Sequence, residues 1–156
     1  MKVLFICTAN SCRSILSEAL FNHLAPPGFH AISAGSFPKG QVLPRSLSTL
    51  QAAGISTDGL YSKGNEAFAD SPPDIVISVC DKAAQEACPV YFGPAIKAHW
   101  GLEDPSDLHG DEAQIDAAFQ ATLQIIETRC RALFDLPFNR LDAAQIKAEL
   151  DRIGLL

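Results

Sequence analysis

Short apolar runs and longer amphipathic stretches alternate along this chain. The apolar run at residues 2–6 has no polar alternation, as expected of a strand buried on both faces of a sheet. Three further runs, each bounded by proline, glycine or polar residues, have the length of a buried strand. The predicted strands cover residues 2–6, 29–34, 74–79 and 95–99.

Between and after these runs, apolar residues recur at helical spacing. The predicted helices cover residues 14–24, 44–53, 112–134 and 142–154. Gly54 lies just past the second helix, and Asp142 is a suitable cap for the last one. Because strands alternate with helices, we expect right-handed crossovers and a parallel sheet. The pattern therefore predicts an α/β fold, a single doubly wound domain with a central parallel four-stranded sheet over residues 1–156.

The composition, 47% hydrophobic and 19% charged residues, is typical of a compact globule rather than a disordered or membrane protein. A net charge of −6 argues against nucleic acid or anionic lipid as a partner. The apolar run at the N-terminus is too short for a signal peptide, and no stretch is long enough to cross a bilayer. We therefore expect a cytoplasmic protein whose five cysteines serve catalysis, metal binding or packing rather than a disulfide framework.

The polar segment between the first strand and the first helix has the composition of an anion-binding loop. Successive backbone N–H groups and a helix N-terminus attract an anion and shift Cys7 toward its nucleophilic thiolate. Arg13, six positions on, can bind two oxygens of a tetrahedral anion with its planar guanidinium. We predict Cys7 as the nucleophile. The predicted oxyanion-binding residues are Thr8, Ala9, Asn10, Ser11, Cys12, Arg13 and Ser14.

Two cysteine loops and one acid are further candidates for chemistry. Cys7 follows the first predicted strand and Cys80 the third, so both loops leave the carboxyl edge of the sheet, where α/β folds bind ligands. Cys80 and Cys88 form a dithiol that can supply two electrons through a disulfide. Asp104 belongs to the only Asp-Pro pair and is the candidate general acid.

These motifs resemble those of a known family. The segment Cys7–Ser14 is similar to the Cys-x5-Arg-Ser/Thr loop of the low-molecular-weight protein tyrosine phosphatase fold, which one class of arsenate reductases shares. Residues 33–35 (Ser-Ala-Gly) are similar to both branches, whereas residues 99–105 look like the His-Trp-Gly-x-x-Asp-Pro stretch of the reductases. The resemblance covers nearly the whole chain and leaves a C-terminal helical extension from about residue 137.

The resemblance implies reduction of arsenate to arsenite. In similar reductases the first cysteine forms an arsenic adduct, a second thiol expels arsenite, and a third resolves the resulting disulfide. Cys7, Cys80 and Cys88 match these roles. The implied partners are arsenate, with phosphate or sulfate as competing anions, and an external thiol reductant, either thioredoxin or glutaredoxin/glutathione. No tightly bound cofactor is expected.

Two alternatives remain open at this point. A low-molecular-weight phosphatase would use the same loop to hydrolyse phosphotyrosine. A structural zinc domain would use four cysteines, although the seven residues between Cys80 and Cys88 exceed the usual hook of two to four residues.

Some related reductases hold a potassium ion behind the loop with an Asn, a Glu, a Ser and an Asp. Asn10, Glu18 and Ser33 match the first three, and Lys63 falls at the fourth position. An ammonium group there would take the place of the cation and bond Glu18 and the Asn10 side chain. We therefore predict that these four residues support the loop without potassium or another metal.

Overall fold

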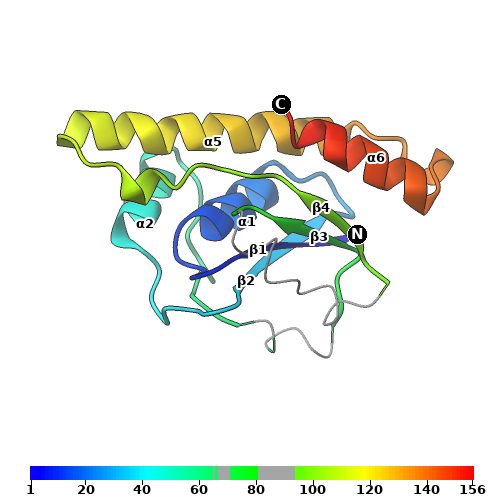
Figure 1. Ribbon diagram of the computed structural model, residues 1–156, viewed down its shortest axis with the longest axis horizontal. Coiled ribbons are helices and arrows are strands. Elements are labelled where there is room, and N and C mark those ends of the chain that lie inside the picture. The colour runs from blue at the N-terminus through cyan, green and yellow to red at the C-terminus, as the bar shows by residue number, and fades with distance from the viewer. Residues whose placement is uncertain (65, 67–70, 81–93) are drawn as a thin grey trace.

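The computed structural model describes residues 1–64, 66, 71–80 and 94–156 (Figure 1). The four strands are β1 (Lys2–Cys7), β2 (His30–Gly35), β3 (Ile75–Ser78) and β4 (Ile96–His99). They form one sheet in the order β2-β1-β3-β4, and every neighbouring pair is parallel. Strand β2 thus lies on one side of β1, and β3 and β4 lie on the other. This arrangement confirms the predicted parallel four-stranded α/β sheet.

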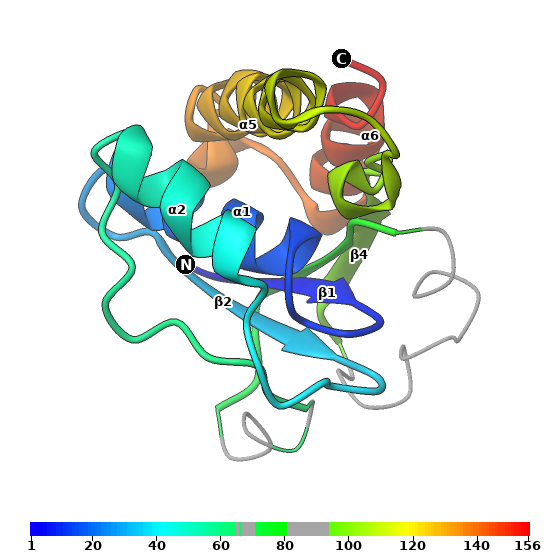
Figure 2. The same cartoon turned by 90° about the vertical axis from the view of Figure 1, so that its left-hand side faces the viewer.

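The described helices lie on one side of this sheet (Figures 1 and 2). They are α1 (Arg13–Leu24), α2 (Pro44–Ala52), α5 (Glu112–Phe134) and α6 (Ala143–Ile153), with short 3-10 turns η2 (Pro105–Asp107) and η3 (Phe138–Arg140). Helix α1 packs against β1 and β2, α5 packs on α1, and α6 packs on β4. Each of the four predicted helices is present, with bounds within one residue of those expected. No helix in these described ranges is long and apolar enough to cross a membrane.

The helix starts differ in a way that the sequence explains. Asp111 and Asp142 each accept a hydrogen bond from the backbone N–H of a glutamine three residues later, and that glutamine side chain bonds back, so α5 and α6 begin with capping boxes. In contrast, no side chain of the described residues caps α1, and its first turn has no acidic residue. The first N–H groups of α1 are therefore available to another acceptor.

Contacts in the core join the sheet to helix α1 and the segment after β4 to helix α6. The Phe5 ring on β1 lies 5.8 Å from that of Phe21 on α1 and 6.1 Å from that of Trp100. The buried Trp100 indole donates to the carbonyl of Leu150, 2.9 Å away on α6. The last helix is thereby fixed to the segment that follows β4.

Candidate active site

Two thiols meet at the carboxyl edge of the sheet. Cys7 ends β1 and Cys80 lies two residues beyond β3, and these strands are paired with Ile6 opposite Ser78. The side chains of Cys7 and Cys80 form a hydrogen bond, and the Thr8 hydroxyl lies 3.6 Å from the Cys80 sulfur. Both cysteines are almost fully buried, at 5% and 2% exposure. The two cysteine loops thus leave the carboxyl edge of the sheet, as predicted, and they meet there.

The loop after Cys7, which we call the oxyanion loop (residues 7–14), has its carbonyl groups directed outward. The carbonyls of Cys7, Thr8 and Ala9 accept from backbone N–H groups of residues 36, 37 and 39 at 3.2, 2.8 and 3.1 Å. The carbonyl of Ser11 accepts from the backbone N–H of Leu43 at 3.0 Å. With the carbonyls engaged on the outside, the loop N–H groups and the uncapped start of α1 can bind an anion on the inside.

Two backbone features give the loop this path. Asn10 has φ of 49°, a left-handed conformation that asparagine tolerates better than most residues. Gly35, at the end of β2, lies directly against the loop: a Cβ atom there would be 2.5 Å from the Thr8 carbonyl oxygen and 2.9 Å from the Asn10 nitrogen. Any side chain at position 35 would therefore displace the oxyanion loop.

Arg13 connects the loop to the predicted acid. Its Nη1 donates to the Leu102 carbonyl at 3.1 Å, and its Nη2 lies 3.4 Å from Asp104 Oδ2. Asp104 Oδ1 accepts from the backbone N–H and the hydroxyl of Ser106, at 3.0 and 2.6 Å. The carboxylate is thus fixed through one oxygen, while the other faces Arg13 at the rim of the loop. This is a suitable position for an acid that protonates a leaving oxygen.

A pocket of about 410 Å³ lies between these groups. The predicted site residues that line it are Cys7, Thr8, Ala9, Ser11, Cys12, Arg13, Cys80 and Asp104. The side chains of Asn10 and Ser14 are fully buried on the other side of the loop, where Asn10 Nδ2 donates to Ser14 Oγ at 2.8 Å. The pocket is also lined by Lys39, Ser106 and Asp107, which the sequence motifs did not identify.

The groups around Cys7 act on its pKa in opposite directions. The hydrogen bond with Cys80 raises the pKa of Cys7 above its ordinary value, and burial acts in the same direction. The charge of Arg13 and the backbone N–H of Thr8 lower it but are outweighed. The loop and Arg13 therefore act on Cys7 in the predicted direction, and burial and the neighbouring Cys80 thiol oppose them. Burial also raises the pKa of Cys12 to about 11.

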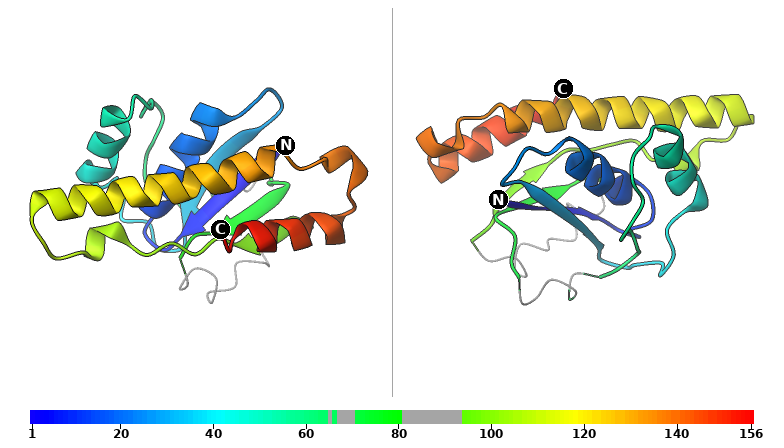
Figure 3. Two further views of the ribbon diagram at one scale, coloured as in Figure 1. Left: turned by 90° about the horizontal axis from the view of Figure 1, so that it is seen from above. Right: turned by 180° about the vertical axis from the view of Figure 1, so that it is seen from behind.

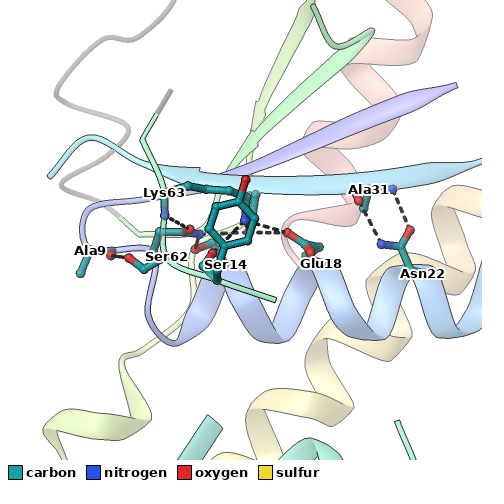
Figure 4. Close-up of polar contacts among 10 residues, drawn as sticks. Ala9, Ser14, Glu18, Asn22, Ala31, Ser62 and Lys63 are labelled. Atoms are coloured by element: carbon teal, nitrogen blue, oxygen red, sulfur yellow. Dashed lines mark hydrogen bonds and ion pairs between the residues drawn. The ribbon is translucent and has the colours of Figure 1, made fainter. Parts of the chain in front are cut away.

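Behind the oxyanion loop lies a polar cluster, the support cluster, formed by Asn10, Glu18, Ser33 and Lys63. Asn10, Ser33 and Lys63 are buried and the Glu18 side chain is 12% exposed; Figure 4 labels Glu18 and Lys63. Ser33 Oγ receives a hydrogen bond from Asn10 Nδ2 at 3.0 Å and donates to Glu18 Oε1 at 2.6 Å. The Lys63 ammonium lies 3.5 Å from Glu18 Oε1, 3.4 Å from Ser33 Oγ and 2.9 Å from the Tyr61 carbonyl. The four predicted supporting residues are thus brought together.

One contact in this cluster corrects a detail of the prediction. The bond that links Lys63 to Asn10 Oδ1, at 2.9 Å, comes from the backbone N–H of Lys63 and not from its ammonium group. Burial lowers the pKa of Lys63, and the Glu18 carboxylate opposes that effect. Lys63 therefore acts twice, through its main chain on the loop and through its charge on Glu18.

Several supporting contacts were missed by the sequence analysis. The Ser62 hydroxyl donates to the Ala9 carbonyl at 3.0 Å, and Ser46 Oγ donates to the Ser11 carbonyl at 3.2 Å. These serines come from separate segments, and only the fold brings them to the loop. Ser106 was detectable in principle, because an Asp two residues before a Ser commonly forms a local hydrogen-bonded turn.

Cys88, the predicted third thiol, lies outside the described residues. Cys130 is fully buried in the core on α5. Among the parts of the chain that are described, no group of three or more His, Cys, Asp or Glu side chains could hold a metal ion.

Residues 2–151 match the family model of the low molecular weight phosphotyrosine protein phosphatases. The chain belongs to this family. Within it, the chain is 30% identical over 112 residues to an arsenate reductase of Staphylococcus xylosus, covering 72% of this chain and 84% of that protein.

Two solved structures of arsenate reductases are also similar to this chain. An arsenate reductase in the phosphate binding state matches with a TM-score of 0.70 and 27% identity, over 85% of this chain and 95% of that one. A thioredoxin-dependent arsenate reductase of Corynebacterium glutamicum matches with a TM-score of 0.63 and 27% identity, over 85% of this chain and 59% of that chain. Both solved structures therefore share the fold of this chain.

Proposed function

We propose that this protein reduces arsenate to arsenite, and the observation that carries the proposal is the second thiol in the anion pocket. Hydrolysis of a phosphate ester requires the loop, one nucleophile and an acid. Cys80, buried and hydrogen-bonded to Cys7, has no role in hydrolysis. It is suited to a reaction that takes two electrons from a pair of thiols. The similarity to arsenate reductases supports the same conclusion.

In the first step the loop N–H groups and Arg13 hold arsenate with its arsenic facing Cys7. The Cys7 thiolate attacks arsenic and forms an S–As bond. One arsenate oxygen leaves as water after receiving a proton from Asp104, which lies at the rim beside Arg13. Arsenic remains in the +5 state in this adduct.

In the second step the Cys80 thiolate attacks the Cys7 sulfur. An S–S bond forms, the S–As bond breaks, and its electron pair stays on arsenic, which leaves as arsenite in the +3 state. The two thiols are thereby oxidised by two electrons. The existing contact between Cys7 and Cys80 places the attacking group beside its target.

In the third step the Cys88 thiolate attacks the Cys80 sulfur and releases Cys7 as a thiolate. An external dithiol then reduces the Cys80–Cys88 disulfide. The similarity to a thioredoxin-dependent reductase favours thioredoxin over glutaredoxin or glutathione. Because every turnover consumes reducing equivalents, we place the protein in the cytoplasm, where thiols are kept reduced.

We further infer that the Lys63 ammonium takes the place of a monovalent cation behind the loop. Its distances to Glu18, Ser33 and the Tyr61 carbonyl, from 2.9 to 3.5 Å, are those of a bound donor in a buried site. The protein then needs neither potassium nor a tightly bound cofactor.

The proposal is tested by arsenate turnover with either thioredoxin or glutaredoxin plus glutathione as the sole reductant. We expect turnover with thioredoxin. We also expect Cys88→Ser to stop after one turnover with a Cys7–Cys80 disulfide, detected by non-reducing peptide mapping. Cys130→Ala removes a core cysteine outside the pocket and is the matched control. Multiple turnover by Cys88→Ser at the wild-type rate would contradict the relay.

Hydrolysis of an aryl phosphate, measured in parallel, addresses the alternative function. We expect a weak hydrolysis that survives Cys80→Ser and Cys88→Ser, because it needs only the loop, Cys7 and Asp104. Strong hydrolysis with no arsenate reduction would identify the protein as a phosphatase instead.

A further inference from the structure

Arg129, five residues before the end of α5, is a buried arginine outside the anion pocket. It is 7% exposed, and its contacts are main-chain carbonyls. Nη1 donates to the Gly101 carbonyl at 3.1 Å, while Nη2 donates to the carbonyls of Gly154 at 2.9 Å and Leu156 at 3.4 Å. Within the described part of the chain its Nε is buried without a hydrogen-bond partner. Burial of a guanidinium with an N–H group left unpaired is unfavourable, so the buried position of Arg129 needs an explanation.

Gly101 begins a segment that leads to the groups around the anion pocket. The next carbonyl along the chain, that of Leu102, accepts from Arg13 Nη1 at 3.1 Å, and the Leu102 N–H donates to the Val79 carbonyl at 3.0 Å. Two guanidinium groups thus hold consecutive carbonyls of one segment. Arg13 holds it from the anion pocket, and Arg129 holds it from α5. Asp104 follows two residues later.

The end of α6 is packed closely against the same segment (Figure 3). A Cβ atom on Gly154 would lie 2.5 Å from the His99 carbonyl oxygen and 2.9 Å from Trp100 Cδ1. The Trp100 indole also donates to the Leu150 carbonyl. Residues 99–104, which we call the acid segment, are therefore fixed by the C-terminal part of the chain as well as by β3.

We propose that Arg129 is a positioning residue, which joins the end of α6 to Gly101 and so holds Leu102 and Asp104 in register with Arg13. This gives the C-terminal segment from about residue 137 a role in the site without contact to the substrate. The inference rests on the proposed roles of Arg13 and Asp104. A displacement of catalytic groups by about 1 Å is enough to lower a rate by up to two orders of magnitude.

The test uses Arg129→Met, which keeps the side-chain bulk and removes the guanidinium, and Arg129→Lys. Arg131→Met is the control on the same helix, because Arg131 is exposed and pairs only weakly with Glu127 at 3.7 Å. We expect Arg129→Met to lower kcat for arsenate about tenfold and Arg129→Lys to recover part of it. Arg131→Met should retain the wild-type kcat.

A double-mutant cycle with Asp104→Asn separates positioning from general stability. If Arg129 acts through the acid segment, Arg129→Met should have much less effect on kcat when Asp104 is already neutralised. Equal fold-losses in both backgrounds, or a wild-type kcat in Arg129→Met, would overturn the proposal.

Two further measurements keep the outcome clear. Gly154→Ala changes no charged group but pushes the end of α6 against His99, and it should lower kcat in the same way if Arg129→Met fails to fold. The affinity for phosphate, measured by calorimetry in a Cys7→Ser background, tests the alignment of Arg13 without turnover. We expect Arg129→Met to bind phosphate several-fold more weakly, even if arsenate proves not to be the substrate. Unchanged phosphate binding in Arg129→Met, together with a wild-type kcat in Gly154→Ala, would refute the positioning role.

Discussion

The two sides of the oxyanion loop are built from different chemistry. Behind the loop lie Asn10, Ser33 and Lys63, which are buried, and Glu18, which is largely buried; the four are paired with one another. In front of it, backbone N–H groups, the uncapped start of α1 and Arg13 face a pocket that also contains two thiols. The loop is thus held in shape by side chains on one side, and its other side presents donors to the pocket. The front should therefore control chemistry, and the back should control stability.

The largest effect is expected at the front, for Cys7→Ser. A hydroxyl in place of the thiol is not ionised near neutral pH, so it cannot attack arsenic. Arsenate reduction and aryl phosphate hydrolysis should both fall to background. The measurement is steady-state turnover of both substrates, with Cys130→Ala as a control that removes a core cysteine. Appreciable turnover by Cys7→Ser would refute the assignment of the nucleophile.

The next effect is expected for Arg13→Lys. A point charge cannot hold the Leu102 carbonyl, Asp104 and two substrate oxygens at the same time. We expect kcat/KM for arsenate to fall by about 10² to 10³. Arg45→Lys is the matched control, since Arg45 forms surface ion pairs with Glu112 and Asp116. A near-normal kcat/KM in Arg13→Lys would contradict the geometry of the front.

At the back, Lys63→Met should act mainly on stability. It leaves the largely buried Glu18 without its cation, which costs about 3 kcal/mol in the free energy of unfolding. Activity should fall only several-fold, because the catalytic groups remain. Lys147→Met, which removes an exposed i,i+4 pair, should change stability by less than about 0.5 kcal/mol. Denaturant unfolding measures both.

The same experiment includes a salt control. For the wild-type protein, Tm and kcat/KM should be equal in potassium and in a large inert cation at matched ionic strength. A specific potassium activation would show that Lys63 does not replace the cation.

The smallest effect concerns the contact between the two thiols. Because the Cys80 hydrogen bond is the largest cause that raises the pKa of Cys7, Cys80→Ala should lower that pKa. A larger fraction of Cys7 is then thiolate at neutral pH. The rate of Cys7 alkylation by iodoacetamide, followed against pH, should shift to lower pH in Cys80→Ala and stay unchanged in Cys130→Ala. A shift to higher pH would mean that Cys80 stabilises the thiolate instead.

The sequence was sufficient for the parts of this molecule that depend on periodicity and local motifs. Strand and helix positions followed from apolar spacing, and the loop followed from the position of Cys7 and Arg13 between a strand and a helix. The meeting of Cys7 and Cys80 followed from the geometry of parallel strands. Lys63 was placed behind the loop by resemblance, and its contacts with Glu18 and Ser33 agree.

What the sequence could not give depends on segments that only the fold brings together. The raised pKa of Cys7 results from a contact across two strands, so the local loop pattern suggested the opposite direction. Lys39 lines the pocket because its backbone is hydrogen-bonded to Ala9, and Arg129 reaches the acid segment from the other end of the domain. No spacing rule relates residues so far apart in the chain.

The close approach of Gly35 to the oxyanion loop has a consequence for selectivity. Because the loop binds through main-chain groups and the Arg13 guanidinium, and Gly35 leaves no space for a side chain that would reshape the main chain, its recognition depends on the tetrahedral form of the anion. Arsenate and phosphate share that form, so phosphate should occupy the loop as a competitor whenever it is abundant. Discrimination then comes after binding: only arsenic can leave with the electron pair of its bond to the Cys7 sulfur when Cys80 attacks that sulfur, and phosphate leaves the loop unchanged.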